Sequence, residues 1–582
     1  MPRNWLLPRG AHPEAAELAR QAGVSPLLGQ LLWARGLTDP AAAQRFLEPR
    51  LEDLHDPCLL PDMDQAVERL VQAVQGGERI LVHGDYDVDG VCSTALLTRV
   101  LRVLKADVEP FVPDRKVHGY DLRVETVHRK AAEGIRLILT ADCGTVAFDA
   151  AEAARERGVD LIITDHHEPS SGGKLPAAVA VVNPHRAGST YPYPHLAGTG
   201  VAYKLATALV QRLGIQSHAF RTHFLDLVAL ATCADCMPLL GENRILVYHG
   251  LDVLRKTNKV GLKALIQAAG LATDRITTTD IGFKLAPRIN AIGRMDAAAH
   301  ALKLLLTTDA GEADELAEQL NDANQERQKE QQRMQESAVR MAEEYLEDRI
   351  LVLSSPRWHP GIVGLVAGRL AESNGQPAAL IAVDEETGIG KGSCRSIPGY
   401  NIFAALDACR PLLLRCGGHA AAAGFDIQAE NVPALRRALQ EHAQKTLSDA
   451  LLRPSLEVDA AVAPHELTLA LAKDLARLEP FGTGNREPVL MSRGLRVLDQ
   501  QRIGKAATSE HMRLKLQSPP AGSLLGAVYW RGWRRAPECL PQQMIDACFT
   551  LEINTYQNVS RPQLVLKDVR PAEGSREETV RQ

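Results

Sequence analysis

This sequence lacks three features that would assign it to a special class of protein. No apolar run reaches about 18 residues, so a membrane-spanning helix is not expected. The first residues have no apolar core typical of a secretion signal. The ten cysteines are scattered among apolar residues and form no even framework, as is usual for reduced thiols inside cells. We therefore expect a cytoplasmic protein.

The chain also lacks an excess of positive charge. Its 66 Lys and Arg residues against 71 Asp and Glu residues give a net charge of -5, so a nucleic-acid-binding surface would have to be local. Cys233 and Cys236 form a single CxxC pair with no second pair at zinc-finger spacing, which disfavours zinc. A length of 582 residues is too great for one core and indicates about three or four domains.

The most informative stretch is an apolar run at residues 80–82 that stops at three acids spaced two apart: Asp85, Asp87 and Asp89. Gly84 and Gly90 bracket these acids, and an apolar helical pattern follows at residues 91–104. We expect a buried strand, a tight acidic loop and a helix. Ligands of open α/β sheets bind beyond the carboxyl ends of the strands. Three carboxylates this close need a cation, most simply a divalent metal.

From this loop onward, strand and helix patterns alternate, which predicts a parallel sheet. We expect helices at residues 63–74 and 146–157, and strands at residues 107–112, 135–140, 160–164 and 178–182. The first loop positions after these strands hold Asp142, Asp165, His166 and His167. Because the carboxyl ends of parallel strands meet at one edge of a sheet, these side chains should converge near the acidic loop.

An apolar run at residues 225–231 precedes a further acid, Asp235. A carboxylate in so apolar a context needs a partner or a metal, although it could instead cap the N-terminus of the next helix. Carboxylates and imidazoles without a thiolate suit Mn²⁺ or Mg²⁺ better than structural zinc. The candidate ligands suffice for two ions. In other enzymes, a pair of metal ions promotes the hydrolysis of phosphate esters. The candidate ligands are His83, Asp85, Asp87, Asp89, Asp142, Asp165, His166, His167 and Asp235.

The middle of the chain predicts a long polar helix followed by a second α/β unit. Residues 310–346 have too few apolar positions for a coiled coil, so we expect a spacer helix. Strands are expected at residues 350–353 and 378–383, a helix from about residue 360, and a turn at residues 390–396. The glycines beside His419 would let a ligand approach closely, or would simply start a helix. Candidate phosphate-binding residues are Arg115, Arg288 and Arg395.

After Pro454, short strands with turn signals predict a small OB-type β-barrel, a fold that commonly binds single-stranded nucleic acid. We expect its strands at residues 456–462, 489–497, 511–516, 526–530, 544–553 and 563–567. Four aromatic residues could stack on bases or could belong to the barrel core: Tyr529, Trp530, Trp533 and Tyr556, beside Arg531, Arg534 and Arg535. The expected division is a helical segment at 1–60, an α/β domain at 61–245, a helical connector at 246–347, a second α/β domain at 348–450, the barrel at 455–570 and a disordered tail at 571–582.

Several motifs of this sequence resemble those of the DHH phosphoesterase superfamily. They are Gly-Asp-Tyr-Asp-Val-Asp-Gly at residues 84–90, Thr-Ala-Asp-Cys-Gly at 140–144, Asp-His-His at 165–167 and Ala-Asp-Cys-Met-Pro-Leu at 234–239. Gly-Ser-Cys-Arg-Ser-Ile-Pro-Gly at 392–399 and Gly-Gly-His-Ala-Ala-Ala-Ala-Gly-Phe at 417–425 resemble the associated DHHA1 domain. With Ala-Pro-Arg-Ile-Asn-Ala-Ile-Gly-Arg-Met at 286–295 and the barrel, residues 50–570 resemble the RecJ family of bacterial exonucleases.

The resemblance implies two α/β domains, DHH and DHHA1, joined by a long helix and followed by an OB-type barrel. It implies two divalent ions, Mn²⁺ or Mg²⁺, bridged by Asp142 and held by His83, Asp87, Asp89, Asp142, His166 and Asp235. Asp85 and Asp165 would orient these ligands, and His167 would contact the scissile phosphate or protonate the leaving oxygen. The implied nucleic-acid-binding residues are Arg115, Arg288, Ser393, Arg395, Ser396, Gly417, Gly418 and His419.

The implied activity is metal-dependent hydrolysis of single-stranded DNA from its 5′ end to 5′-mononucleotides, in DNA repair and recombination. One alternative is a DHH/DHHA1 phosphodiesterase of short oligonucleotides or cyclic dinucleotides, but such proteins usually lack a barrel. Another is an inactive binding subunit of a replication complex, but such relatives lose motif acids that are all present here. The resemblance implies a monomer that does not bind membranes. Its expected partners are single-stranded DNA, a single-strand-binding protein and a RecQ-type helicase.

Overall fold

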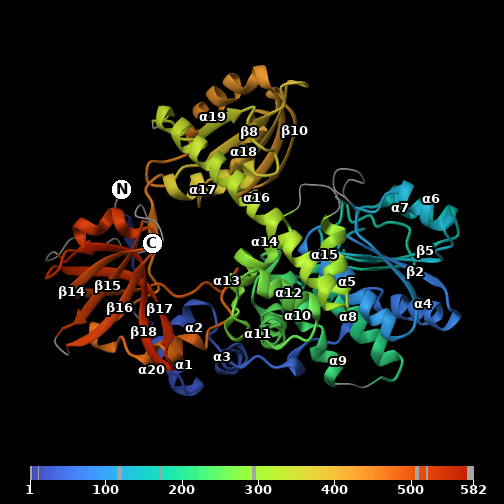
Figure 1. The fold of residues 1–582 in the computed structure, drawn as a ribbon, viewed down its shortest axis with the longest axis horizontal. Helices are drawn as coiled ribbons and strands as arrows, with labels where there is room; N and C mark the ends of the chain where they lie inside the picture. Colours follow the sequence, from blue (N-terminus) through green and yellow to red (C-terminus); the bar gives the residue numbers. More distant parts are fainter. Residues whose placement is uncertain are drawn as a thin grey trace.

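The computed structural model of the chain describes residues 3–8, 10, 12–113, 121–170, 172–215, 218–291, 297–345, 347–504, 510–519 and 522–572. Two α/β units and a β-barrel are the main bodies, and a long helix joins the two α/β units (Figure 1). None of the described helices is both long and apolar enough to cross a membrane. The tail predicted at residues 571–582 lies, from residue 573 onward, outside the described residues.

The first α/β unit contains a five-stranded parallel sheet with strand order β3-β2-β4-β5-β6. The strands are β2 (Arg79–Gly84), β3 (Asp107–Phe111), β4 (Leu137–Ala141), β5 (Asp160–Thr164) and β6 (Ala180–Val182). Their side chains alternate between two cores. Leu139 and Ile162 pack with the helices α4 (Met63–Gly76), α5 (Val88–Val103) and α8 (Gly198–Arg212). Ile138 and Ile163 pack with α6 (Val124–Ala132) and α7 (Phe148–Glu156). The predicted parallel sheet is confirmed, and its strands end at one edge.

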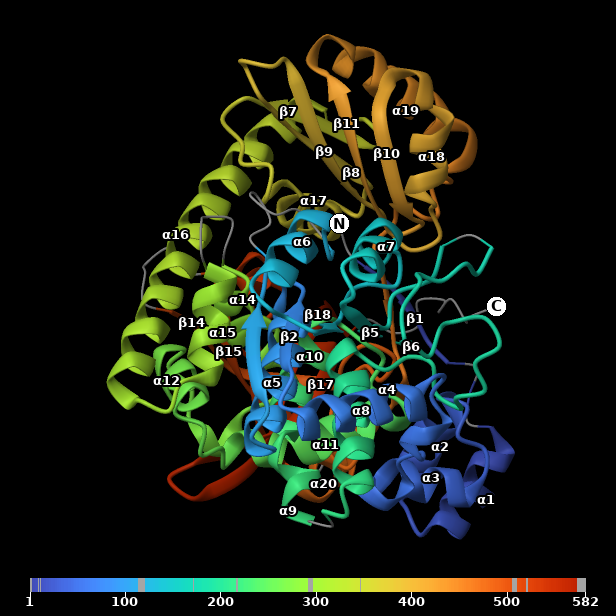
Figure 2. The ribbon, with the colours of Figure 1, turned by 90° about the vertical axis from the view of Figure 1, so that its right-hand side faces the viewer.

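A helical region and the long helix α16 (Ala310–Ala342) follow this sheet. The helices before α16 include α9 (His218–His223), α10 (Leu225–Ala234), α11 (Gly241–Arg255), α12 (Val260–Ala268), α13 (Thr278–Asp280), the π-helix Ile281–Leu285, α14 (Ala286–Ile289) and α15 (Ala297–Leu306). Leu316 and Leu320 of α16 belong to the core of the first unit, whereas Met334 and Ala338 belong to a core of the second. Figure 2 shows α16 running along one side of the molecule between these two units.

The second α/β unit is a mixed sheet with strand order β10-β11-β9-β8-β7. Its elements are β7 (Leu351–Ser355), α17 (Val363–Asn374), β8 (Ala378–Val383), β9 (Ile389–Arg395), α18 (Ile402–Ala408), β10 (Leu413–His419), β11 (Ala422–Gln428) and α19 (Val432–Thr446). The turn predicted at residues 390–396 is wrong, because these residues form β9. Its glycines leave room for large neighbours: a Cβ on Gly392 would lie 2.2 Å from the Phe425 ring. The residues around His419 form a β-hairpin and do not start a helix.

The C-terminal strands form a closed barrel of OB type, as predicted. The sheet order is β13-β14-β15-β16-β18-β17, and a pairing of β14 with β17 closes it. The barrel strands are β14 (Leu490–Ile503), β15 (His511–Ser518), β16 (Ser523–Tyr529), β17 (Met544–Tyr556) and β18 (Val559–Pro571). The strand predicted at residues 456–462 is instead two short strands, β12 (Ser455–Glu457) and β13 (Ala460–Ala461), with different partners.

The N-terminal segment is part of the barrel's core, which its local pattern did not reveal. Its elements are β1 (Asn4–Leu6), α1 (Pro13–Ala22), α2 (Pro26–Ala34) and α3 (Pro40–Leu47). Strand β1 pairs in parallel with β12, and Trp5 Nε1 donates to Asp568 Oδ2 at 2.8 Å. Leu28 and Leu31 lie in one apolar cluster with α20 (Leu469–Ala476) and the barrel strands. Residues from the two ends of the chain thus share one core.

Candidate active site

The acidic loop after β2 is tightly folded, and its shape requires both bracketing glycines. A Cβ on Gly90 would lie 2.4 Å from the backbone oxygen of Asp85, and a Cβ on Gly84 would lie 1.9 Å from Thr94 Oγ1. Helix α5 begins three residues before its apolar pattern because Asp87 caps it, accepting a hydrogen bond of 3.0 Å from Gly90 N. Asp89 therefore lies in the first turn of α5.

Asp89 is held by the N-terminus of α8, which the sequence pattern did not assign to the site. Its carboxylate accepts hydrogen bonds of 2.7 Å from the N–H groups of Gly198 and Thr199, and one of 2.5 Å from Thr199 Oγ1. The free N–H groups at a helix N-terminus stabilise a negative charge. Position 198 also excludes a side chain, since a Cβ there would lie 2.4 Å from Asp142 Oδ1. Helix α8 therefore sets the positions of two acids at once.

Asp142 follows β4 and is only 1% exposed. Burial, and next the charges of Asp89 and Asp87, raise its pKa well above the usual value. Its Oδ1 has no hydrogen-bond partner among the described residues, although His166 Nε2 lies 3.1 Å away. A buried carboxylate oxygen without a partner is costly, and a bound cation would satisfy it.

Asp165 organises the two histidines that follow it after β5. Its carboxylate accepts hydrogen bonds from the backbone N–H groups of Thr145 (2.9 Å), His166 (2.7 Å) and His167 (3.1 Å), and lies 2.7 Å from His167 Nδ1. Burial alone would raise the pKa of Asp165, but the bonds from His167 and Thr145 outweigh it and lower the pKa to about 2. The hydrogen bond to Asp165 in turn raises the pKa of His167 to about 9. His167 is therefore held with Nε2 pointing away from Asp165.

His166 belongs to both of two groups of side chains that could bind a metal ion. One group is Asp142, His166 and His167, and the other is Asp89, His166 and Asp235. Nε2 of His166 lies 3.1 Å from Asp142 Oδ1, 3.7 Å from Asp235 Oδ2 and 3.8 Å from Asp89 Oδ2. Adjacent groups of carboxylates and imidazoles that share one residue suit a pair of divalent ions.

Two more carboxylates have raised pKa values that a nearby cation would lower. Burial, and next the charge of Asp87, raise the pKa of Asp85 to about 7. Burial, and next the charge of Asp89, raise the pKa of Asp235 to about 8. Oδ1 of Asp85 is also buried without a hydrogen-bond partner among the described residues. The site thus holds more carboxylates than its own residues neutralise, and this fits the divalent ions that its donor set favours.

Four of the predicted residues lie outside the two groups: His83, Asp85, Asp87 and Asp165. His83 is buried at the end of β2, with Nδ1 3.7 Å from Cys143 Sγ. Asp235 follows the last residue of α10, and the residue preceding α11 is Leu240. The alternative that Asp235 caps the N-terminus of the next helix is therefore wrong.

The predicted phosphate-binding residues lie on the second α/β unit and on α14. Ser393 and Arg395 are on β9, where Arg395 Nη1 donates to Ser393 Oγ at 3.1 Å. Gly417, Gly418 and His419 end β10, which is an edge strand within the described sheet. Arg288 on α14 donates to Asn321 Oδ1 on α16 at 3.2 Å. Ser396 already donates its hydroxyl to Tyr400 O at 2.6 Å, and Arg115 lies outside the described residues.

Asn183 is, like Thr199, a residue that supports the site without having been predicted. It is buried at the end of β6, and its Nδ2 donates to His167 O and to Thr145 Oγ1, both at 2.8 Å. The signal was present, because Asn183 is the first polar residue after an apolar strand, as Asp142 is.

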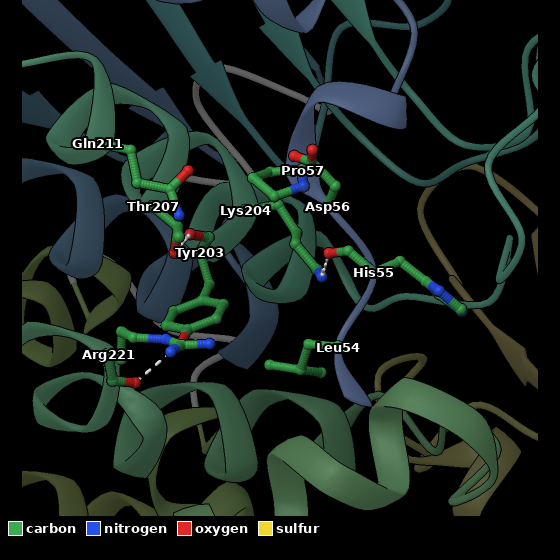
Figure 3. A pocket seen from close by; sticks show the side chains of 9 residues that line it. All are labelled: Leu54, His55, Asp56, Pro57, Tyr203, Lys204, Thr207, Gln211 and Arg221. Carbon is green, nitrogen blue, oxygen red and sulfur yellow. Dashed lines mark hydrogen bonds between the residues drawn. The ribbon is translucent and has the colours of Figure 1, made fainter. Parts of the chain in front are cut away.

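A separate pocket of about 190 Å³ lies between α8, α9 and residues 54–57 (Figure 3). Its buried Lys204 donates to His55 O at 2.6 Å and pairs with Glu242 at 2.5 Å. Glu242 also accepts a hydrogen bond of 2.5 Å from Tyr191. The protein itself neutralises this lysine, and none of the predicted site residues lines the pocket.

Comparison with known proteins agrees with this arrangement. Family models match the DHH family N-terminal domain at residues 79–232, the DHHA1 domain at residues 347–445 and the RecJ OB domain at residues 458–568. The single-stranded-DNA-specific exonuclease RecJ of Bacillus subtilis is 38% identical over 98% of this chain and 71% of its own length. This chain belongs to the RecJ family. The RecJ of Escherichia coli is 33% identical over 98% of this chain and 100% of its own length.

A solved RecJ structure has the same overall fold. The crystal structure of Thermus thermophilus RecJ in complex with Mn²⁺ is 31% identical, matches 98% of this chain and 80% of its own chain, and has a TM-score of 0.80. A structure of that RecJ in complex with Mg²⁺ has a TM-score of 0.74 at 30% identity, with 98% of this chain and 79% of that chain covered.

The aromatic residues of the RecJ-type barrel divide between its core and its surface. Tyr529 and Trp533 pack against the apolar cluster of the barrel, whereas Trp530 is 57% exposed and Tyr556 is 72% exposed. Arg535 is committed to Glu538 and Asp568, and Arg534 pairs with Glu510 at the surface. Of these four aromatic side chains, Trp530 and Tyr556 are therefore the more exposed.

Proposed function

We propose that this chain is a metal-dependent exonuclease that hydrolyses single-stranded DNA from its 5′ end and releases 5′-mononucleotides in DNA repair and recombination. The observation that carries the proposal is the pair of metal-binding groups sharing His166, in a chain of the RecJ family. Family membership also supports single-stranded DNA as the substrate, because the curated relatives are named as exonucleases specific for it.

The residues proposed to hold two divalent ions, Mn²⁺ or Mg²⁺, are His83, Asp87, Asp89, Asp142, His166 and Asp235, with Asp142 between the ions. Such ions, when bound, supply charge neutralisation at the phosphate and lower the pKa of an attacking water. The orphaned oxygen of Asp142 and the raised pKa of Asp235 support this assignment. The T. thermophilus relative was crystallised with each of these two metals.

The other residues near the metal groups are assigned to orientation and proton transfer. Asp165 fixes the ring of His167 through Nδ1, so Nε2 is the nitrogen that can reach a phosphate oxygen. His167, with a pKa raised to about 9, carries a proton at neutral pH that it can donate to the leaving oxygen. Asp85 would orient the neighbouring ligands, since it is buried beside Asp87.

Holding the DNA backbone is assigned to residues of the second α/β unit together with Arg115 and Arg288, which precede that unit in the chain. We assign this role to Arg115, Arg288, Ser393, Arg395, Ser396, Gly417, Gly418 and His419. The guanidinium of Arg395 has no carboxylate partner among the described residues, which leaves its charge for a phosphate. The proposed domains are residues 61–245 for catalysis, 348–450 for substrate holding and 455–570 for the barrel, in keeping with the matched family models.

The cellular setting that we propose is that of the family: a monomer in the cytoplasm, working with a single-strand-binding protein and a RecQ-type helicase. Membership of the RecJ family is what supports these assignments.

The deciding experiment is digestion of a long single-stranded DNA labelled at either end, with Mn²⁺ or Mg²⁺, beside blunt duplex and a dinucleotide. Early release of mononucleotide from the 5′ end of the single strand alone is the expected result. Turnover of the dinucleotide alone would point to a short-substrate phosphodiesterase, and tight binding without turnover to an inactive binding subunit.

A further inference from the structure

The long helix α16 carries a polar strip that contacts Arg288, one of the proposed phosphate-binding residues, at its start and Arg369 of α17 farther along. Asn321, Asn324, Arg327, Gln331 and Gln335 recur at intervals of three or four residues, so they lie along one face of the helix. At 1.5 Å per residue, the strip is about 21 Å long. Near its start, Arg288 donates to Asn321 Oδ1 at 3.2 Å, and farther along Gln331 contacts Arg369 of α17.

Two arginines meet on this strip without a carboxylate between them. Arg327 donates from Nη2 to Asn324 Oδ1 at 3.0 Å and from Nη1 to Gln331 Oε1 at 3.3 Å. With its amide turned over, Gln331 instead accepts from Arg369 Nη1 at 3.0 Å. Burial, and next the charge of Arg369, lower the pKa of Arg327. Arg327 is partly buried and Arg369 is exposed, and within the described chain neither guanidinium has a carboxylate as an ion-pair partner.

Unused hydrogen-bond donors lie at the same place. Nε of Arg327 and Nδ2 of Asn324 are buried without a hydrogen-bond partner among the described residues, as is one acceptor of the strip, Gln335 Oε1, and Asn324 is only 1% exposed. A native structure rarely leaves buried donors unsatisfied. Two neighbouring cations together with unused donors are groups that a bound anion would satisfy.

Helix α17 connects the strip to the proposed phosphate-binding strand. A Cβ on Gly364 would lie 2.9 Å from Ser393 Oγ and 3.1 Å from Arg395 Nη2, so α17 packs directly on that end of β9. Arg369 is on the same helix and contacts α16. The cations therefore follow one another from α14 along α16 and α17 to β9.

We propose that Arg327 and Arg369 form a further phosphate-binding site, which holds the backbone of the single strand between Arg288 and the pair Ser393 and Arg395. This rests on the proposed function, because it adds contacts to the same substrate. Guanidinium groups form bidentate bonds to phosphate oxygens, and a phosphate would satisfy both the charges and the unused donors. Helix α16 then binds substrate in addition to joining the two α/β units.

The test compares Arg369→Met and Arg327→Met with Arg333→Met. Arg333 is a matched control because it is also on α16 but is exposed and faces Glu330. Binding of a fluorescent single strand is measured in EDTA over a range of salt concentrations. Each lost phosphate contact should weaken binding about tenfold and reduce the slope of log K against log salt by about 0.7. With Mn²⁺ present, KM should rise by about the same factor while kcat changes little.

Arg369→Lys separates substrate binding from a structural role. A lysine keeps a charge for phosphate and should retain the salt slope, although it cannot reproduce the guanidinium's contacts to Gln331. The proposal is overturned if Arg369→Met has the same DNA affinity, salt slope and KM as Arg333→Met, whether or not its thermal midpoint falls. Arg369 is exposed, so this variant should fold even if Arg327→Met does not. Wild-type protein that binds single-stranded DNA but does not cleave it would refute the proposed function. The salt slopes of the Arg327 and Arg369 variants would still decide whether these two residues bind phosphate.

Discussion

The edge of the first sheet and the facing side of the second α/β unit have opposite imbalances of charge. At the first sheet, Asp85, Asp142 and Asp235 have pKa values raised by burial and next by the charges of neighbouring acids, chiefly Asp87 and Asp89. On the second unit and α16, Arg395 and Arg369 have no described carboxylate as an ion-pair partner. One region has too few cations and the other too few anions.

This difference indicates that a different component of the reaction balances the charge of each region. Divalent ions would balance the carboxylates, and the phosphates of the substrate would balance the arginines. Changes in the first region should therefore reduce turnover and metal binding, whereas changes in the second should reduce affinity for DNA. The following predictions test this separation, from the largest effect to the smallest.

Replacing Asp142 with Ala should reduce kcat more than about 100-fold, because residues that only support metal ligands already cost 10- to 100-fold when changed. DNA affinity measured in EDTA should stay close to that of the wild type, since the proposed DNA contacts are elsewhere. Asp149→Ala is the control, because Asp149 is an exposed acid of the same unit. Equal loss of binding and cleavage in Asp142→Ala would contradict the separation.

Replacing Thr199 with Val removes the hydroxyl that donates to Asp89 Oδ1. We expect the affinity for Mn²⁺ to fall roughly tenfold, with a matching fall in kcat at limiting metal that saturating metal restores. Titration calorimetry measures the metal affinity directly. Thr207→Val is the control, because the hydroxyl of Thr207, on the same helix, donates to Tyr203 O and not to the site. An unchanged Mn²⁺ affinity would show that the backbone N–H groups of α8 suffice to hold Asp89.

Replacing Arg395 with Met should raise KM for a long single strand about tenfold and leave kcat nearly unchanged, because a charge-assisted hydrogen bond contributes about 1.5–3 kcal/mol. Steady-state kinetics on end-labelled DNA measures both constants. Arg410→Met is the control, since Arg410 is an exposed residue of the same unit that pairs with Asp407. A fall in kcat without a change in KM would place Arg395 with the catalytic residues instead.

Thermal stabilisation by Mn²⁺ should grow as pH rises from about 6 to about 8.5. The raised pKa values of Asp85, about 7, and Asp235, about 8, mean that the metal-free fold favours their protonated forms. Its stability is therefore highest below the ordinary carboxyl pKa and falls as pH rises through 7 to 8, and bound metal reverses this trend. At 100 times Kd, metal adds about 2.7 kcal/mol, a shift of roughly 5 °C or more for the unit that holds the site. A stabilisation that shrinks with rising pH would contradict the carboxylate assignment.

The parts of the fold that the sequence predicted well are those specified by local periodicity. The buried strands of the first sheet and the alternating strands of the barrel both appear as expected, with ends shifted by a few residues. The turn predicted at residues 390–396 was wrong because glycine signals both turns and close packing. Here Gly392 makes room for Phe425, a residue that is distant in sequence.

The candidate site was predictable where a polar residue ends an apolar strand. Asp142 and His166 follow this pattern, whereas Asp235 follows an apolar helix, and the structure brings the three together. Thr199 could not be predicted in this way, because its bond to Asp89 joins residues 110 positions apart and only the folded sheet brings α8 beside α5. The arginines without a carboxylate partner, Arg327 of α16 and Arg369 of α17, could likewise not be predicted, since their surroundings depend on how α16 packs against α17.

The packing of the first helices against the barrel has a consequence for the order in which the chain is made. Trp5 and its partner Asp568 are 563 residues apart. At about 5–20 residues per second, the ribosome delivers the second roughly half a minute to two minutes after the first. The first α/β unit can fold during that time, while Leu28, Leu31 and Leu32 of α2 wait for barrel strands that do not yet exist. Residues of this helix thus stay exposed on the growing chain until the barrel strands that bury them have been made.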